Sequence, residues 1–143
     1  MPEQSLPVFD RTLQKTNVWL TDVMAELDIE DRHTAYSALR ATLHALRDRL
    51  TVDEAANLAA QLPLLIRGVY FENWHPAGTP LKERHKEQFL EHIKRDLPDQ
   101  DPERVARAVF SVLAGYVTAG EIEDVVWMLP EGVRELWPAG TVA

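Results

Sequence analysis

The second half of this 143-residue chain repeats the first half at a spacing of 67 residues. The repeat includes a Thr-x-x-Glu sequence, at Thr51 and again at Thr118. This sequence is typical of a capping box, in which the threonine and glutamate side chains each satisfy a free amide at a helix start. It also includes a Leu-Pro pair, ending at Pro63 and Pro130, and proline is favoured in the first turn of a helix. Eight positions are identical in the two halves: Arg40/Arg107, Ala41/Ala108, Leu46/Leu113, Thr51/Thr118, Glu54/Glu121, Leu62/Leu129, Pro63/Pro130 and Arg67/Arg134. Because helix starts recur in register, we expect a tandem duplication of one helical unit.

Apolar residues recur at three- and four-residue spacing throughout the chain, which is typical of amphipathic helices. One such stripe runs from Phe9 to Leu27, and the most apolar helix follows the start signal Asp101-Pro102-Glu103. We therefore predict an all-α fold: a tandem duplication of a four-helix unit, with about eight helices packed as one compact, bundle-like domain. The repeat units are 1–76 and 77–143, with either one shared core or two.

A short aromatic phrase also occurs twice, as WHPAGTP from Trp74 and as WPAGT from Trp137. Its proline and glycine residues are typical helix breakers. We expect each copy to end a repeat unit, with its tryptophan packed back over the end of that unit. The alternative is a pair of ligand-binding loops.

Composition and charge exclude several classes of function. The formal net charge of −8 argues against a nucleic-acid surface, because nucleic-acid-binding proteins usually present a basic field. The absence of cysteine excludes disulfides, thiol catalysis and thiolate metal sites. The N-terminus lacks the pattern of a signal peptide, and no apolar run reaches the roughly 18 residues that a membrane span requires. We expect a cytoplasmic protein without membrane or nucleic-acid partners.

Three segments carry a resemblance to a known family: VFDRTLQKTNVWL at 8–20, AYSALRATLHALRDRLTVDEAANLAAQLPLLIRGVYFENWHPAG at 35–78, and GEIEDVVWMLP at 120–130. With these motifs the chain resembles a bacterial family of unknown function, DUF2267, over nearly its whole length. The resemblance implies an all-helical soluble fold with internal duplication. It implies no activity, cofactor or catalytic residue.

The sequence contains few candidate catalytic or metal-binding residues. His85 and His92 lie seven residues apart, roughly 10 Å along a helix, so they cannot share one zinc ion unaided. A site that adds Glu87 or Glu91 stays open, but a solvated amphipathic helix explains the pattern better. The serines lie outside any Gly-x-Ser-x-Gly elbow, and neither a phosphate-binding loop nor a dinucleotide motif occurs. We therefore predict no catalytic residue, no cofactor and no metal ligand, and we favour a protein that is not an enzyme.

Basic residues of the predicted helices have two interpretations. His33, Ser37, Arg40, His44 and Arg47 form a stripe beside the apolar face of their helix, either as a docking edge for an acidic partner or as an exposed polar flank. Arginine also follows each Leu-Pro pair by four residues, and a buried arginine requires a carboxylate or carbonyl partner. We expect these arginines to anchor their own units, with anion binding as the alternative. The predicted structural anchors of the repeat are Thr51, Glu54, Pro63, Arg67, Thr118, Glu121, Pro130 and Arg134.

The preferred function is a non-enzymatic module that binds another protein or itself, with a homo-oligomer as one outcome. Aromatic side chains are favoured at protein contacts, so the predicted surface is Tyr70, Phe71 and Trp74, with Arg40, His44 and Arg47 beside it. The alternative is a small-ligand or metal-binding protein that uses the cleft between the repeats, with Arg67, Arg134, His85 and His92 as its polar groups.

Overall fold

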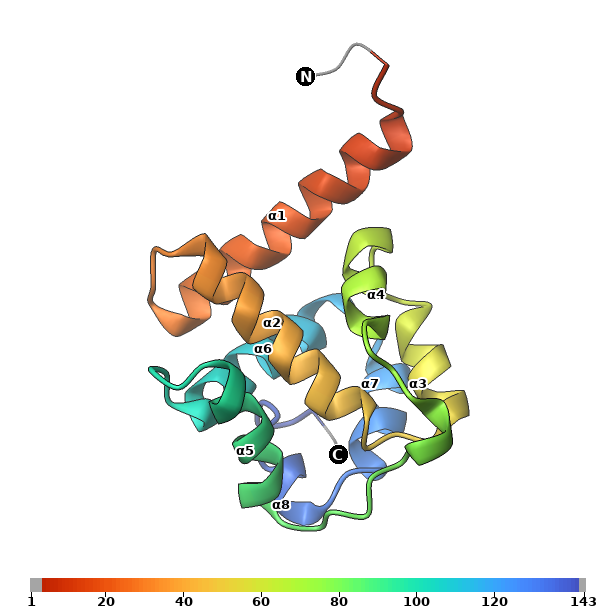
Figure 1. The fold of residues 1–143 in the computed structure, drawn as a ribbon, viewed down its shortest axis with the longest axis vertical. Coiled ribbons are helices and arrows are strands. Elements are labelled where there is room, and N and C mark those ends of the chain that lie inside the picture. Colours follow the sequence, from red (N-terminus) through yellow and green to blue (C-terminus); the bar gives the residue numbers. More distant parts are fainter. Residues whose placement is uncertain (1–3, 142–143) are drawn as a thin grey trace.

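The computed structural model describes residues 4–141, and within them the chain forms eight α-helices and one short 3₁₀ helix (Figure 1). The helices are α1 (Pro7–Leu27), α2 (Arg32–Arg47), α3 (Val52–Ala59), α4 (Leu64–Phe71), η1 (Pro76–Gly78), α5 (Lys86–Asp96), α6 (Pro102–Tyr116), α7 (Ala119–Trp127) and α8 (Glu131–Arg134). No strand occurs in this range. The all-α prediction with eight helices is confirmed.

The helices begin where local sequence predicts. Thr51 precedes α3, and its hydroxyl accepts a hydrogen bond from the amide three residues later at 3.2 Å. Thr118 does the same before α7 at 3.4 Å. Asp101 precedes α6 and accepts from the amide two residues later at 3.0 Å. Pro63 and Pro130 stand directly before α4 and α8, with nearly equal φ angles of −56° and −59°. Side chains at these boundaries satisfy or remove amides that lack partners within the helix.

The two halves of the chain are interleaved. In the middle of the fold, α2 and α6 contact each other (Figure 1). The first helix, α1, packs against α2 and also against α6, while α5 packs against α6 and also against α2. Likewise α3 of the first half packs against α7 of the second. A duplicated unit related by a two-fold axis would produce such crossed pairs, although the duplication itself stays a prediction.

Buried side chains from both halves form one hydrophobic cluster. Tyr70 from α4, Phe89 from α5 and Phe110 from α6 are among its largest fully buried members. The ring of Phe110 lies 5.8 Å from that of Phe89 and stacks on Trp137 with centroids 4.1 Å apart. Residues of 1–76 and 77–143 therefore share a core, and the boundary between the two predicted units stays a prediction.

The apolar stripe of α1 has two different environments. At its C-terminal end Leu20 and Leu27 are buried in the core. At its N-terminal end the helix extends beyond the other helices, with only α4 beside it (Figure 1). Leu6, Phe9 and Leu13 are each about half exposed there, at 53%, 53% and 49%. The stripe predicted one continuous helix, which is confirmed, but only part of it packs against the rest of the fold.

The two tryptophans of the repeated phrase are placed differently. Trp74 is half-buried and contacts Phe71 with ring centroids 5.1 Å apart, before η1 ends the segment. Trp137 is buried in the core, three residues after the end of α8. Among residues 4–141, no helix combines the length and the apolar character required to cross a bilayer.

Candidate functional site

The first turns of α3 and α7 lie at a contact between the two halves, where the helices run antiparallel. Gln61, just after α3, donates from Nε2 to the hydroxyl of Thr118 at 3.1 Å, and the Thr118 amide donates to Gln61 Oε1 at 2.9 Å. At the other end, the Thr51 hydroxyl lies 3.8 Å from the sulfur of Met128. The start of each helix is thus beside the end of the other.

The capping boxes predicted at these helix starts are only half formed. The two threonine hydroxyls cap their helices, but neither glutamate turns back to the amide of its threonine. For α7 the reason is visible, because Gln61 already accepts a hydrogen bond from the Thr118 amide. Within the described residues, Glu54 Oε2 and Glu121 Oε2 are buried without a hydrogen-bond partner. The prediction that these carboxylates complete the boxes was wrong.

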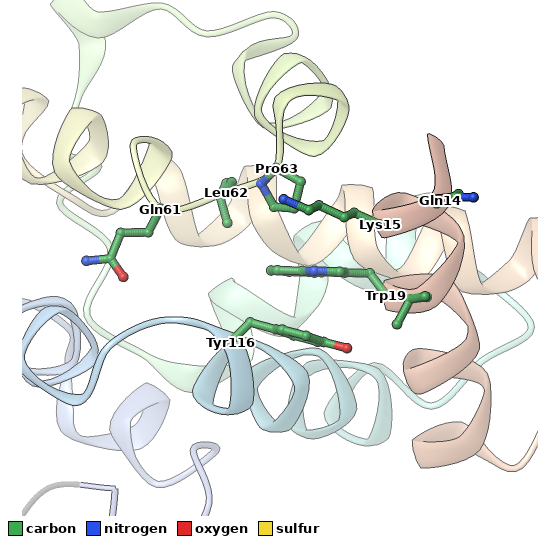
Figure 2. Close-up of a pocket in the computed structure, with 8 residues that line it drawn as sticks. Gln14, Lys15, Trp19, Gln61, Leu62, Pro63 and Tyr116 are labelled. Carbon is green, nitrogen blue, oxygen red and sulfur yellow. The ribbon is translucent and has the colours of Figure 1, made fainter. Parts of the chain in front are cut away.

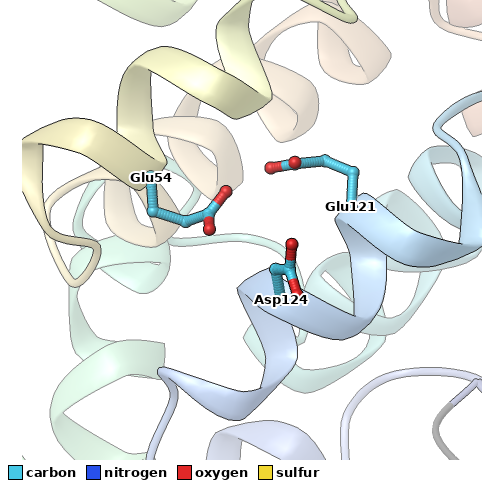
Figure 3. Close-up of side chains that lie close together, drawn as sticks. All are labelled: Glu54, Glu121 and Asp124. Carbon is cyan, nitrogen blue, oxygen red and sulfur yellow. The ribbon is translucent and has the colours of Figure 1, made fainter.

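The freed carboxylates meet a third one in a cluster shown in Figure 3, where Glu54 extends from α3 and the other two from α7. One oxygen from each of Glu54, Glu121 and Asp124 lies within 4.8 Å of the others. Glu54 is buried at 6% exposure, Glu121 is half-buried and Asp124 is exposed. Oxygen-only clusters of this kind are the ligand sets of hard divalent cations. Asp124 was missed in the sequence, although its three-residue spacing from Glu121 places both on one helix face.

The electrostatics of the cluster favour a proton or a cation. Burial, together with the Glu54 carboxyl and more weakly Asp124, raises the pKa of Glu121 to about 8. Three carboxylates this close repel one another when all are ionised. At neutral pH the cluster therefore either retains a proton or requires a positively charged partner.

The two repeated arginines bind backbone carbonyl groups in equivalent turns. Arg67 donates from Nε to the carbonyl of Ala59 at 2.9 Å and from Nη2 to that of Leu62 at 3.0 Å. Arg134 donates from Nε to the carbonyl of Leu129 at 2.8 Å and from Nη2 to that of Trp127 at 3.2 Å. These carbonyls lie at the ends of α3 and α7, where helices lack acceptor partners. Each arginine thus holds the turn that links two helices of its own half.

The basic stripe of α2 binds the end of α4. Arg47 is buried, and its Nη1 donates to the carbonyls of Tyr70 and Glu72, both at 2.7 Å. His44 Nε2 lies 2.7 Å from the carbonyl of Val69, and burial lowers the pKa of this histidine. Arg40 pairs with the Glu72 carboxylate at 2.9 Å. Three side chains of the predicted docking edge therefore have partners within the chain.

The predicted aromatic surface is mostly covered. Tyr70 is fully buried and donates its hydroxyl to the Ala55 carbonyl at 2.9 Å. Phe71 and Trp74 are half-buried and pack against the core. Their remaining exposed edges are all that a partner could touch. A role for these residues in protein contacts stays a prediction.

The two histidines and the two repeated arginines of the alternative site make different contacts. His85 precedes α5, and its amide donates to Gln88 Oε1 at 3.1 Å. His92 Nε2 lies 3.2 Å from Glu83 Oε1, and the same carboxylate pairs with Arg49. Both histidines have local contacts beside α5, and Arg134 lines a cavity together with Glu83, whereas Arg67 binds carbonyls at the end of α3. The structure does not bring these four residues into one site.

A groove of about 530 Å³ lies between α1 and the α3–α4 connection (Figure 2). Its aromatic wall is Trp19 stacked on Tyr116, with ring centroids 4.7 Å apart. The other lining residues are Gln14, Lys15, Val18, Gln61, Leu62 and Pro63. This lining is largely apolar, and Lys15 is its one charged member. The groove could accept an apolar side chain.

Comparison with known families agrees with the fold. Residues 16–136 match the family model described as "Uncharacterized conserved protein (DUF2267)". The chain belongs to the DUF2267 family. The resemblance predicted from the sequence is thereby confirmed, and the match includes α2 to α8 and most of α1. No curated protein matches this DUF2267 chain. Membership in this family does not establish an activity.

Proposed function

We propose that this DUF2267 protein is a non-enzymatic interaction module that associates with itself through the projecting half of α1. The observation that supports this proposal is the apolar stripe of α1, which is buried at Leu20 and exposed at Phe9 and Leu13. Exposed apolar side chains on consecutive turns of one helix face form a contiguous patch, and such patches mark interaction sites. A second helix packed on this face would extend the burial of the stripe to its N-terminal end.

The adjoining start of α4 enlarges this patch. The Leu65 amide donates to the Thr12 hydroxyl of α1 at 2.9 Å, which holds the start of α4 beside the projecting half. Leu64 and Leu65 are exposed, at 50% and 40%. The apolar surface therefore includes two elements, one of which is anchored in the core through Ile66.

Charge favours a second copy of the chain as the partner. Residues 4–18 contain one acidic side chain, Asp10, and two basic ones, Arg11 and Lys15, so this segment carries +1 while the whole chain carries −8. Two copies can therefore meet here without the repulsion that their other surfaces would produce. In a two-fold interface, one patch that carries both signs can be complementary to itself.

Light scattering after size-exclusion chromatography tests this proposal. We expect a dimer for the wild-type protein and a monomer for Leu13→Asp, with unchanged helicity by circular dichroism. Val18→Asp is the matched control, because Val18 is 52% exposed on the same helix. It lies nine residues, or about two and a half turns, from Phe9 and therefore on the opposite helix face. The control should stay dimeric. A wild-type protein that remains monomeric at about 100 times the concentration of a typical micromolar Kd contradicts self-association.

The proposal includes a cytoplasmic location, no cofactor and no nucleic-acid partner. The net charge of −8 supports the last of these, because nucleic-acid surfaces are usually basic. The alternative function, ligand or metal binding between the two halves, is favoured by a separate observation. That observation is the carboxylate cluster of α3 and α7.

A further inference from the structure

We infer that Glu54, Glu121 and Asp124 form a binding site for one divalent cation of the calcium class, placed between the two halves of the chain. The inference is independent of self-association, because the cluster lies on α3 and α7 and the proposed dimer surface on α1 and α4. The ion would join helices that belong to different halves.

The spacing of the oxygens suits a calcium-sized ion. Calcium binds oxygen at about 2.3–2.6 Å, so two ligands on opposite sides of the ion lie about 4.6–5.2 Å apart. One oxygen from each of the three side chains falls within 4.8 Å of the others. Small rotations of these side chains would therefore bring all three groups onto one ion. Three carboxylates offer up to six oxygens, which matches calcium's usual six to eight when water completes the shell.

The buried member of the cluster supplies a second, independent reason. Glu54 is 6% exposed, and its Oε2 has no hydrogen-bond partner among the described residues. Figure 3 shows its carboxylate directed toward the two acidic side chains of α7. Buried polar atoms in folded proteins nearly always have a partner, and a buried carboxylate without one is costly. A bound cation satisfies this oxygen and the equally unpartnered Oε2 of Glu121.

The cluster is also open on one side. Asp124 is exposed, so water and ions can reach the site from the surface of α7. The neighbouring Glu123 is exposed on the same helix but is not one of the three clustered residues. These two acids carry the same charge and are both exposed on α7, which makes them a matched pair for mutation.

Calcium titration of the chelator-treated protein tests the inference at pH 7.5. Isothermal titration calorimetry should show one Ca²⁺ per chain, and the melting temperature should rise by about 5 °C or more at saturation. Asp124→Asn should weaken calcium binding at least tenfold, whereas Glu123→Gln should leave it unchanged. Sodium chloride at equal ionic strength controls for general screening of the acidic surface.

Glu121→Gln separates a cation site from a pair of carboxyls that share a proton. This variant should be more stable than the wild type in chelator, because a neutral amide removes repulsion, and it should no longer respond to calcium. A wild-type protein whose melting temperature and calorimetric heat do not change with calcium overturns the inference. Equal loss of binding in Glu123→Gln and Asp124→Asn overturns it as well, since that result would indicate diffuse surface charge. Neither outcome depends on the oligomeric state.

Discussion

Glu54 and Glu121 occupy the same position in their helices, three residues after a capping threonine, and their carboxylates meet across the contact between α3 and α7. Each lies near a helix N-terminus, where the partial positive charge of the free amides favours an anion. That attraction does not offset their mutual repulsion, since burial and the Glu54 carboxyl raise the pKa of Glu121 to about 8.

The raised pKa predicts a pH-dependent stability in the absence of metal. An unfolded chain loses the Glu121 proton near pH 4.5, whereas the folded protein retains it up to about pH 8. The folded state therefore binds more protons in this window, and its stability falls as the pH rises from 4.5 to 8. We expect Glu121→Gln to flatten this slope and to be more stable than the wild type at pH 8.5. Urea unfolding followed by circular dichroism, with chelator present, measures the effect. Glu123→Gln should keep the wild-type slope, and a variant at position 121 with that same slope would contradict the prediction.

Truncation at two positions of the α1 stripe should give unequal losses of stability. Leu20 is 7% exposed in the core and Leu13 is 49% exposed on the projecting half. We expect Leu20→Ala to lower the free energy of unfolding by about 2–4 kcal/mol, because it leaves a cavity. Leu13→Ala should change it by less than about 0.5 kcal/mol in the monomer. Chemical denaturation at low protein concentration provides the comparison. A similar loss at both positions would mean that the N-terminal half of α1 is also packed within the monomer.

Arg47 and Arg40 of α2 should also differ in their contribution to stability. The buried Arg47 guanidinium satisfies the carbonyls of Tyr70 and Glu72, while Arg40 forms a partly exposed ion pair. We expect Arg47→Ala to cost about 3 kcal/mol, since both carbonyls lose their donor. Arg40→Ala should cost less than about 1 kcal/mol. Lysine at position 47 should restore little, because one ammonium does not reproduce the geometry of the guanidinium. Thermal melting of the three variants is the measurement, and rescue by lysine would argue that charge alone matters.

The repeated arginines predict matched effects in the two halves. Arg67 donates to three carbonyls and Arg134 to two, all at or just after the end of the preceding helix. We expect Arg67→Ala and Arg134→Ala to destabilise the protein by similar amounts, about 1–3 kcal/mol. Arg84→Ala, at an exposed position before α5, should change stability by less than about 0.5 kcal/mol. Loss of stability at only one of the repeated positions would contradict their equivalence.

The helices were predictable from the sequence because their signals are local. The threonine caps before α3 and α7 and the prolines before α4 and α8 act within one turn of the chain, so short-range chemistry suffices. Which residues of a helix are buried was less predictable from the sequence. The periodicity of α1 is the same at Phe9 and Leu20, and only the position of the other helices determines which of them is buried.

The carboxylate cluster was not predictable for a related reason. The Thr-x-x-Glu sequence correctly predicted the threonine half of each cap. The direction of Glu54 depends on an antiparallel helix 67 residues further along the chain, and the amide of Thr118 is occupied by Gln61. The partners of the basic stripe of α2 were likewise not visible in the sequence, because the carbonyls at the end of α4 follow more than 20 residues later. Without these partners, the stripe was predicted as a possible docking edge.

The crossed packing of α1 on α6 and of α5 on α2 has a consequence for how the chain can be divided. A fragment that ends at residue 76 would lose α6 from beside α1 and α5 from beside α2. The fragment that begins at residue 77 would lose α1 from beside α6 and α2 from beside α5. Each fragment alone would be left with uncovered apolar helices, whereas a mixture of the two contains every surface needed to rebuild the intact fold. Splitting the molecule at its midpoint should therefore yield two pieces that acquire structure only by finding each other.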